Sequence, residues 1–105
     1  MRWHDSFQLA PGGDAFATTV VSSGRSVATG GWVQDAAGRY TWSLRTYDVR
    51  TGALVDRDEG DIGGLNSLAE GEGRLFAAGF VGGDASSPAA FAVRAYSFAP
   101  AHAGR

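Results

Sequence analysis

Internal similarity constrains this 105-residue chain most strongly, because one half of the sequence matches the other at an offset of 49 residues. Residues 23–30 align with residues 72–79, and residues 42–47 align with residues 91–96. The identical pairs are Gly24 and Gly73, Arg25 and Arg74, Ala28 and Ala77, Gly30 and Gly79, Arg45 and Arg94, and Tyr47 and Tyr96. Glycine and alanine are abundant enough to match by chance, so the arginine and tyrosine pairs carry the argument. The sequence predicts two copies of one unit.

Each copy has the pattern of short β-strands. Residues 39–47 alternate large apolar with polar side chains, which is the period of a half-buried strand. Further strands are expected at residues 16–21, 25–33, 53–56, 65–69, 74–81 and 89–98, separated by glycine-rich turns. The alanine-rich segment 89–95 would favour a helix in isolation. Its partner in the first copy contains Tyr40, Thr41 and Trp42, so a strand is expected there too.

Four short antiparallel strands repeated every 40–50 residues or so are typical of β-propeller blades. The expected fold is all-β, with two four-stranded antiparallel blades forming a partial propeller. Residues 14–59 would form the first blade and residues 63–98 an incomplete second one, with an orphan outer strand at 1–7 and a tail at 99–105. A sandwich does not need such a period, and a barrel of two all-strand repeats is the remaining alternative.

The segment from Thr46 to Asp56 resembles the docking repeat of quinoprotein-type (PQQ-like) β-propellers, Ala-x-Asp-x-x-Thr-Gly-x-x-x-Trp. Asp48, Thr51 and Gly52 match that repeat. The N-terminal Trp3, Asp5 and Phe7 resemble a blade strand of the same family, and Gly30-Gly31-Trp32 makes the kelch propeller the runner-up.

The resemblance implies structural roles for the matched residues. We expect Asp48 to accept hydrogen bonds from amides of its own turn and Gly52 to supply the backbone angles of a tight hairpin. Tyr47 and Tyr96 would pack between blades with their hydroxyls on polar partners. Gly30 and Gly79 would allow another backbone to approach closely.

Composition excludes several classes of function. The chain has 9 Lys and Arg, all of them Arg, against 11 Asp and Glu, so no basic surface for nucleic acid or anionic membrane is expected. The absence of Cys excludes disulfides, thiolate metal sites and cysteine nucleophiles. No signal peptide or membrane span is evident, which predicts a cytoplasmic protein if the chain is complete and a periplasmic or extracellular one if it is a fragment.

Several groups of residues invite a chemical interpretation, and each has a structural alternative. The acidic cluster at 56–61 lacks the distal Glu and further oxygens of a calcium loop, so a solvated blade tip is expected. His4 and His102 have no companions at metal-ligand spacing, and no Gly-x-Ser-x-Gly frames a nucleophile. Trp3, Trp32, Tyr40 and Trp42 could stack on sugar rings, but packing between blades is the better interpretation. No catalytic, cofactor-binding or metal-binding residue is predicted.

These observations favour a non-catalytic propeller module that acts as a protein-binding or assembly scaffold. A carbohydrate-binding propeller lectin is one alternative, and a fragment of a quinone-dependent dehydrogenase is another. Two blades cannot enclose the central channel that holds the quinone and Ca²⁺ in enzymes of that family. Because propellers close with about 4–8 blades, we expect a head-to-tail ring of identical chains or further blades of a longer chain.

Overall fold

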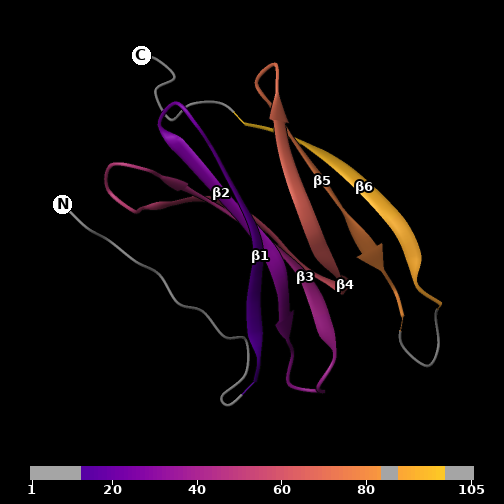
Figure 1. Cartoon of the computed structure of the whole chain (residues 1–105). Helices are drawn as coiled ribbons and strands as arrows, with labels where there is room; N and C mark the ends of the chain where they lie inside the picture. Colours follow the sequence, from indigo (N-terminus) through magenta and orange to yellow (C-terminus); the bar gives the residue numbers. More distant parts are fainter. Residues whose placement is uncertain (1–12, 84–87, 99–105) are drawn as a thin grey trace.

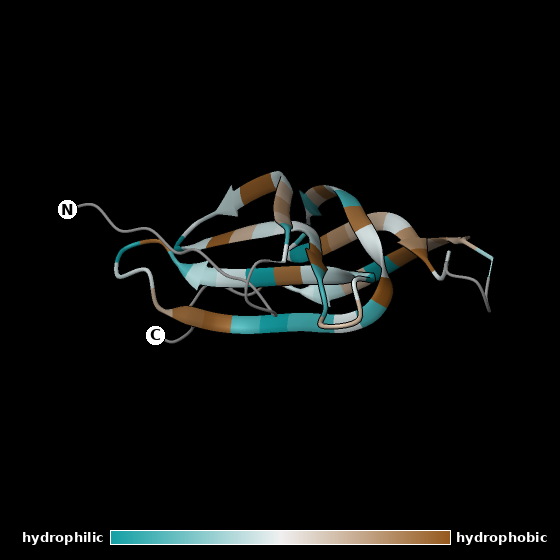
Figure 2. Ribbon diagram, turned by 90° about the horizontal axis from the view of Figure 1, so that it is seen from below, coloured by the Kyte–Doolittle hydropathy of each residue, from teal (hydrophilic) through white to brown (hydrophobic). Residues whose placement is uncertain are grey.

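The computed structural model describes residues 13–83 and 88–98, which contain six β-strands and no helix (Figure 1). The strands are β1 (Ala15–Ser23), β2 (Ser26–Gln34), β3 (Tyr40–Asp48), β4 (Leu54–Gly71), β5 (Arg74–Val81) and β6 (Ala90–Ser97). Figure 2 shows how hydrophobic and hydrophilic residues are distributed along the strands. The expected all-β fold is confirmed. The alanine-rich segment forms β6, so pairing with β5 overrides its helical propensity.

The strands form one antiparallel sheet in the order β1-β2-β3-β4-β5-β6, and β4 belongs to both of its halves. Residues 54–62 of β4 pair with β3, whereas residues 63–71 pair with β5. We call β1, β2, β3 and residues 54–62 the first half-sheet, and residues 63–71, β5 and β6 the second. The sheet curls so that the two half-sheets face each other, and β4 crosses between them (Figure 1).

The predicted end of a strand at Asp56 is wrong, because β4 continues for 18 residues. The glycines that looked like strand breakers instead allow the strand to bend. Gly60 and Gly63 have φ angles of 118° and 144°, and Gly63 is the first residue of β4 to pair with β5. A Cβ on Gly63 would overlap the carbonyl oxygen of Phe80. Only glycine combines this backbone angle with so close an approach.

The hydrophobic core lies between the two half-sheets. Its buried members are Ala28, Trp42, Leu44, Leu65, Leu75, Ala77 and Phe98. The side chain of Leu65 occupies the space above Gly30, where a Cβ would meet both of its methyl groups. The expected close approach at Gly30 is therefore made by a side chain rather than by a backbone.

The turn between β3 and β4 has the geometry expected from its residues. The Asp48 carboxylate accepts hydrogen bonds from the amides of Arg50 and Thr51, at 2.8 and 3.3 Å. The amide of Gly52 donates to the Asp48 carbonyl, and its φ of 79° is in the region that favours glycine. Both predicted roles in this turn are confirmed.

The two half-sheets have the same ladder geometry. Each first hairpin contains a bulge, between Ala17 and Thr19 in one and between Leu65 and Ser67 in the other. Both hairpins are closed by a two-residue turn, after the pairs Ser23–Ser26 and Gly71–Arg74. These features correspond at an offset of 48 residues, one fewer than in the sequence alignment.

The third strand of each half-sheet keeps the offset of 49. The amide of Val49 donates to the carbonyl of Arg25, and the amide of Phe98 donates in the same way to that of Gly73. Gly79 therefore corresponds in the ladder to Gly31 rather than to Gly30. In the first two strands of each copy, the sequence alignment therefore differs from the structural correspondence by one residue. The cause is that the alignment pairs Gly24 with Gly73, although Gly24 is the first residue of its turn and Gly73 the second.

The predicted orphan strand at 1–7 and the tail at 99–105 lie outside the described residues. Trp3, Asp5, Phe7, His4 and His102 therefore have no structural account.

Candidate functional site

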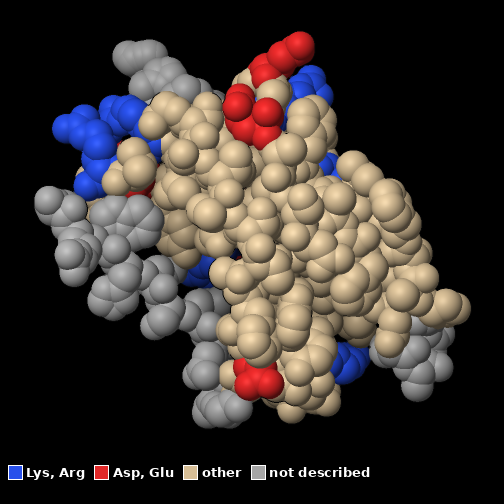
Figure 3. All heavy atoms as spheres, viewed as in Figure 1, with Lys and Arg blue, Asp and Glu red and all other residues tan. Residues whose placement is uncertain are grey.

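The second half-sheet exposes a continuous apolar surface on the side away from the core. Leu75 and Ala77 are buried in the core, so their neighbours along β5 point outwards. We call this surface the apolar face, and it consists of Phe76, Ala78, Phe80, Phe91, Val93 and Ala95. These residues form directly opposed pairs across β5 and β6, and the side chain of Phe91 is 84% exposed. Figure 3 shows a broad area without charged side chains over these strands.

The apolar face ends at an unpaired strand edge. Among the described strands β6 pairs only with β5, so its other edge presents free backbone donors and acceptors. An exposed edge beside an apolar face is a template for association with another chain. No outward-facing charged side chain in β6 would hinder the pairing of another strand with this edge. Arg94 is the one charged residue of β6, and it points towards the core.

The other side of the second half-sheet carries a charged cluster centred on Arg94. Its guanidinium donates to Asp58 at 2.9 Å and to Asp61 at 2.6 Å, both on β4. It also lies over the ring of Trp42, 4.5 Å from the centroid, which is a cation–π geometry. The Tyr96 hydroxyl donates to the same Asp58 carboxylate. This cluster joins the two half-sheets through β3, β4 and β6.

The surroundings of this cluster shift two pKa values. Burial and the hydrogen bond to the Asp58 carboxylate raise the pKa of Tyr96 to about 12. Burial alone would lower the pKa of Arg94, but its hydrogen bonds to Asp61 and Asp58 more than offset this, so its pKa lies above the ordinary value. Both groups keep their usual protonation states at neutral pH. The cluster therefore has the properties of a structural ion network.

The acidic cluster at 56–61 is not the solvated tip that the sequence predicted. These residues lie within β4, where a register shift between Glu59 and Ile62 interrupts the alternation of side chains and brings Asp61 to the same side as Asp58. Asp58 and Asp61 bind Arg94 between the half-sheets, whereas Glu59 binds Arg45 at 3.0 Å on the opposite side. The sequence could not reveal these pairings because the arginines are 14 to 36 residues away. The one sequence feature that pointed to these arginines is that Arg45 and Arg94 are identical residues at matching positions of the two copies.

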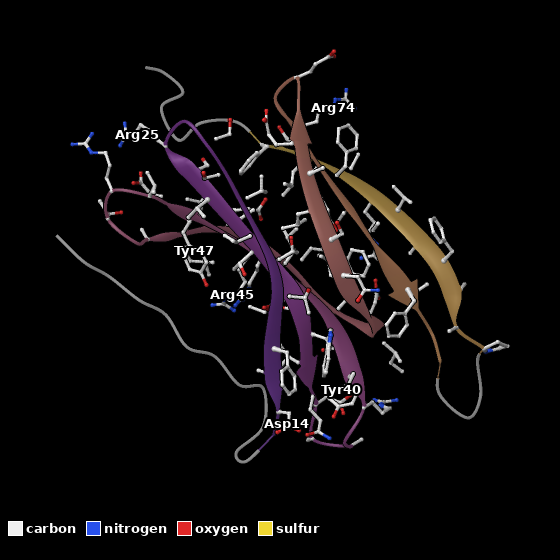
Figure 4. All side chains as sticks on the ribbon, in the orientation of Figure 1. Asp14, Arg25, Tyr40, Arg45, Tyr47 and Arg74 are labelled. Atoms are coloured by element: carbon white, nitrogen blue, oxygen red, sulfur yellow. The ribbon has the colours of Figure 1, made fainter. Side chains whose placement is uncertain are left out.

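Arg45 belongs to a second polar group, on the outer side of the first half-sheet. Its Nε donates to the Tyr47 hydroxyl at 3.0 Å, and the two side chains lie together in Figure 4. Ser43 donates to the same Glu59 carboxylate at 3.2 Å. The expectation that both tyrosine hydroxyls have polar partners is confirmed. Tyr96 lies at the junction of the half-sheets, whereas Tyr47 lies on an outer side.

The aromatic residues considered as sugar platforms are mostly packed against protein. Trp42 is fully buried and cannot reach a sugar ring in this structure. Its indole nitrogen has no hydrogen-bond partner among the described residues. Trp32 lies between Phe16 and Tyr40, with ring centroids 4.4 and 4.6 Å away. This trio is a self-packed cluster at one end of the first half-sheet.

Neither a metal-binding cluster nor a membrane-spanning helix is present in residues 13–83 and 88–98. In these ranges no group of three or more His, Asp or Glu side chains is placed to hold a metal ion. No helix there is long and apolar enough to cross a membrane. No family model, curated protein or solved structure matches the chain. The apolar face is thus the candidate functional site of the described residues.

Proposed function

We propose that this chain is a non-catalytic β-propeller-type repeat module and that its apolar face is a protein-binding surface used in assembly. The observation that carries the proposal is the continuous pairing of uncharged apolar side chains across β5 and β6, with Phe91 84% exposed. Exposed apolar areas of this kind mark interaction sites when polar residues surround them. No charge on this face would have to be desolvated on binding.

The interpretation of the chain as two blades rests on the similar strand pairing of the two half-sheets. The first half-sheet would be a four-stranded blade, and the second would be a blade of three strands. The matching bulges, turns and backbone hydrogen bonds support a common ancestry of the two units. The Asp48–Gly52 turn supports the resemblance to PQQ-like propellers, because both matched residues act locally as that docking repeat requires.

The charged residues support a structural role over a catalytic one. Asp58, Asp61 and Glu59 each bind an arginine of the same chain, and the arginines hold strands together. A catalytic carboxylate needs a pKa suited to proton transfer and access to a substrate. The binding surface lies on the other side of the second half-sheet, away from Arg94.

Sedimentation over a range of protein concentrations tests this proposal. We expect the wild-type mass to rise above the 10.9 kDa of one chain as concentration increases. Phe91→Asp places a charge in the apolar face and should restore the single-chain mass. Val55→Asp is the control, because Val55 is 55% exposed on β4 outside that face. A Phe91→Asp protein that associates as the wild type does would contradict the proposal.

A further inference from the structure

The ladder correspondence assigns a counterpart to each residue of the apolar face. At offsets of 48 for β5 and 49 for β6, the counterparts lie on β2 and β3. Phe76, Ala78, Phe80, Phe91, Val93 and Ala95 correspond to Ala28, Gly30, Trp32, Trp42, Leu44 and Thr46, respectively. These counterparts form the side of the first half-sheet that the second half-sheet covers. Phe76, Phe91, Val93 and Ala95 are exposed, whereas Ala78 and Phe80 are half-buried and Phe80 lies near Trp32 beside Gly64. The apolar face is therefore the same surface with most of its cover missing.

The covering surface has counterparts too. The second half-sheet covers the first with Leu65, Leu68, Leu75, Ala77, Arg94 and Tyr96. The same offsets relate these residues to Ala17, Val20, Val27, Thr29, Arg45 and Tyr47 on the outer side of the first half-sheet. We call this second set the mixed face. The apolar face is thus the counterpart of the covered surface and the mixed face the counterpart of the covering surface, of which Ala17 and Val20 on β1 are exposed in a single chain.

Resting on the proposed function of the apolar face, we propose that its partner is the mixed face of a second copy of this chain, bound head to tail. Such an interface is heterologous, since different surfaces of the two copies meet. It leaves one apolar face and one mixed face without a second copy bound at the two ends of each complex. Further copies can then add until a ring closes.

The internal interface specifies how the inner strands would meet. The Thr18 hydroxyl donates to the Leu65 carbonyl at 2.8 Å, and the Leu68 amide donates to the Thr19 hydroxyl at 3.3 Å. The counterparts of the two threonines are Asn66 and Ser67, which are exposed and again carry a side-chain donor or acceptor. In the proposed complex Asn66 faces the Ala17 carbonyl and Ser67 faces the Val20 amide of the second copy.

The exposure of the mixed face identifies the strand that makes this contact. Along β1, Val20 is 68% exposed and Ala17 and Ser22 are also exposed, whereas Ser43 and Tyr47 on β3 are buried. The second copy therefore docks through β1. Arg45 on β3, the counterpart of Arg94, is bound to Glu59 and Tyr47 and only 13% exposed, so it is not part of this contact.

Complementation between two defective variants tests the head-to-tail arrangement. Phe91→Asp disables the apolar face, Val20→Asp disables the mixed face, and Val55→Asp is the exposed-valine control. Each of the first two proteins should be monomeric alone. Their equimolar mixture should form a complex of two chains and nothing larger, because only one intact interface can then form. The control should associate as the wild type does.

Two outcomes separate this inference from the proposed function. If Phe91→Asp abolishes association but Val20→Asp does not, the apolar faces bind each other and the head-to-tail inference is wrong. If Phe91→Asp has no effect, or the wild type stays monomeric, the proposed function itself is wrong. Circular dichroism confirms that each variant is folded. Val93→Asp and Ser22→Arg replace any variant that is not, since Val93 is exposed on the apolar face and Ser22 is exposed on β1, on the same side of the sheet as Val20.

Discussion

Arg94 on β6 stacks on Trp42 on β3, with the guanidinium carbon 4.5 Å from the ring centroid. The contact joins residues 52 positions apart and brings the two half-sheets together at the point where β4 bends between them. It also explains how a charged side chain is accommodated beside a fully buried indole. Asp58 and Asp61 neutralise the charge from one side while the aromatic ring faces it from the other.

Removing this side chain should weaken the junction between the half-sheets. We expect Arg94→Ala to lower the free energy of unfolding by about 1–3 kcal/mol, because a cation–π contact and charge-assisted hydrogen bonds are lost. Arg57→Ala is the matched control, since that side chain is 62% exposed and 4.0 Å from Glu59. It should change stability by less than about 0.5 kcal/mol. Urea unfolding measures both, and equal effects would contradict the structural role of Arg94.

The raised pKa of Tyr96 predicts a loss of stability at alkaline pH. The folded protein holds the phenol neutral up to a pKa of about 12, against an ordinary value near 10. Its contribution to stability is therefore complete below pH 10 and is lost as pH rises from about 10 to about 12. Tyr96→Phe cannot ionise there, so its stability should fall less over that range. Parallel pH profiles of unfolding for the two proteins would contradict this expectation.

Two glycines of the sheet should respond in opposite ways to alanine. A Cβ on Gly31 would overlap the carbonyl oxygen of Phe16 on the paired strand, whereas one on Gly71 would meet nothing within 4 Å. Gly31→Ala should cost about 1–3 kcal/mol, as overpacking against a backbone does. Gly71→Ala should be neutral or stabilise by up to about 1 kcal/mol, since it restricts the unfolded chain. Thermal melts compare them, and a tolerated Gly31→Ala would contradict the β1–β2 register.

The turn after β3 should resist a β-branched residue. Gly52 has a φ of 79°, and we expect Gly52→Val to cost about 1–3 kcal/mol of stability because valine rarely adopts that angle. Ala53→Val in the same exposed turn is the control, since Ala53 has no positive φ. An unchanged melting midpoint for Gly52→Val would show that the turn has another conformation.

Calcium should not stabilise the protein through residues 56–61. The carboxylates of Asp58, Asp61 and Glu59 already bind Arg94 and Arg45, so a cation would have to displace those arginines. Calorimetric melts with millimolar calcium and with a chelator should coincide. A rise of several degrees in calcium that Asp58→Asn abolishes would contradict this arrangement.

Local sequence patterns predicted much of the fold. Alternation identified β3, the match to the first copy identified β6, and the residues from Asp48 to Gly52 specified the turn between β3 and β4. The continuity of β4 was missed, since Gly60 and Gly63 resemble strand breakers and act instead as bend positions within a paired strand. Whether a glycine breaks or bends a strand depends on the strands beside it.

The candidate site was less accessible to sequence reasoning. The strand pattern of residues 89–98 indicates two sides but not which of them is covered. In the structure Arg94 points to the core and Phe91 to the outside, the reverse of what hydropathy alone would suggest. The acids of β4 decide this, because they bind Arg94 only when it faces the first half-sheet. Such a long-range pairing has no local signal.

Hydrogen exchange at two protein concentrations tests the central claim most directly, because it locates the assembly surface. We predict that amides of β5 (Arg74–Val81) and β6 (Ala90–Ser97), the strands that carry the apolar face, exchange more slowly in concentrated than in dilute wild-type protein. In Phe91→Asp their exchange should be the same at both concentrations. Exchange in these segments that does not change with the concentration of the folded wild-type chain would contradict the claim that the apolar face is an assembly surface.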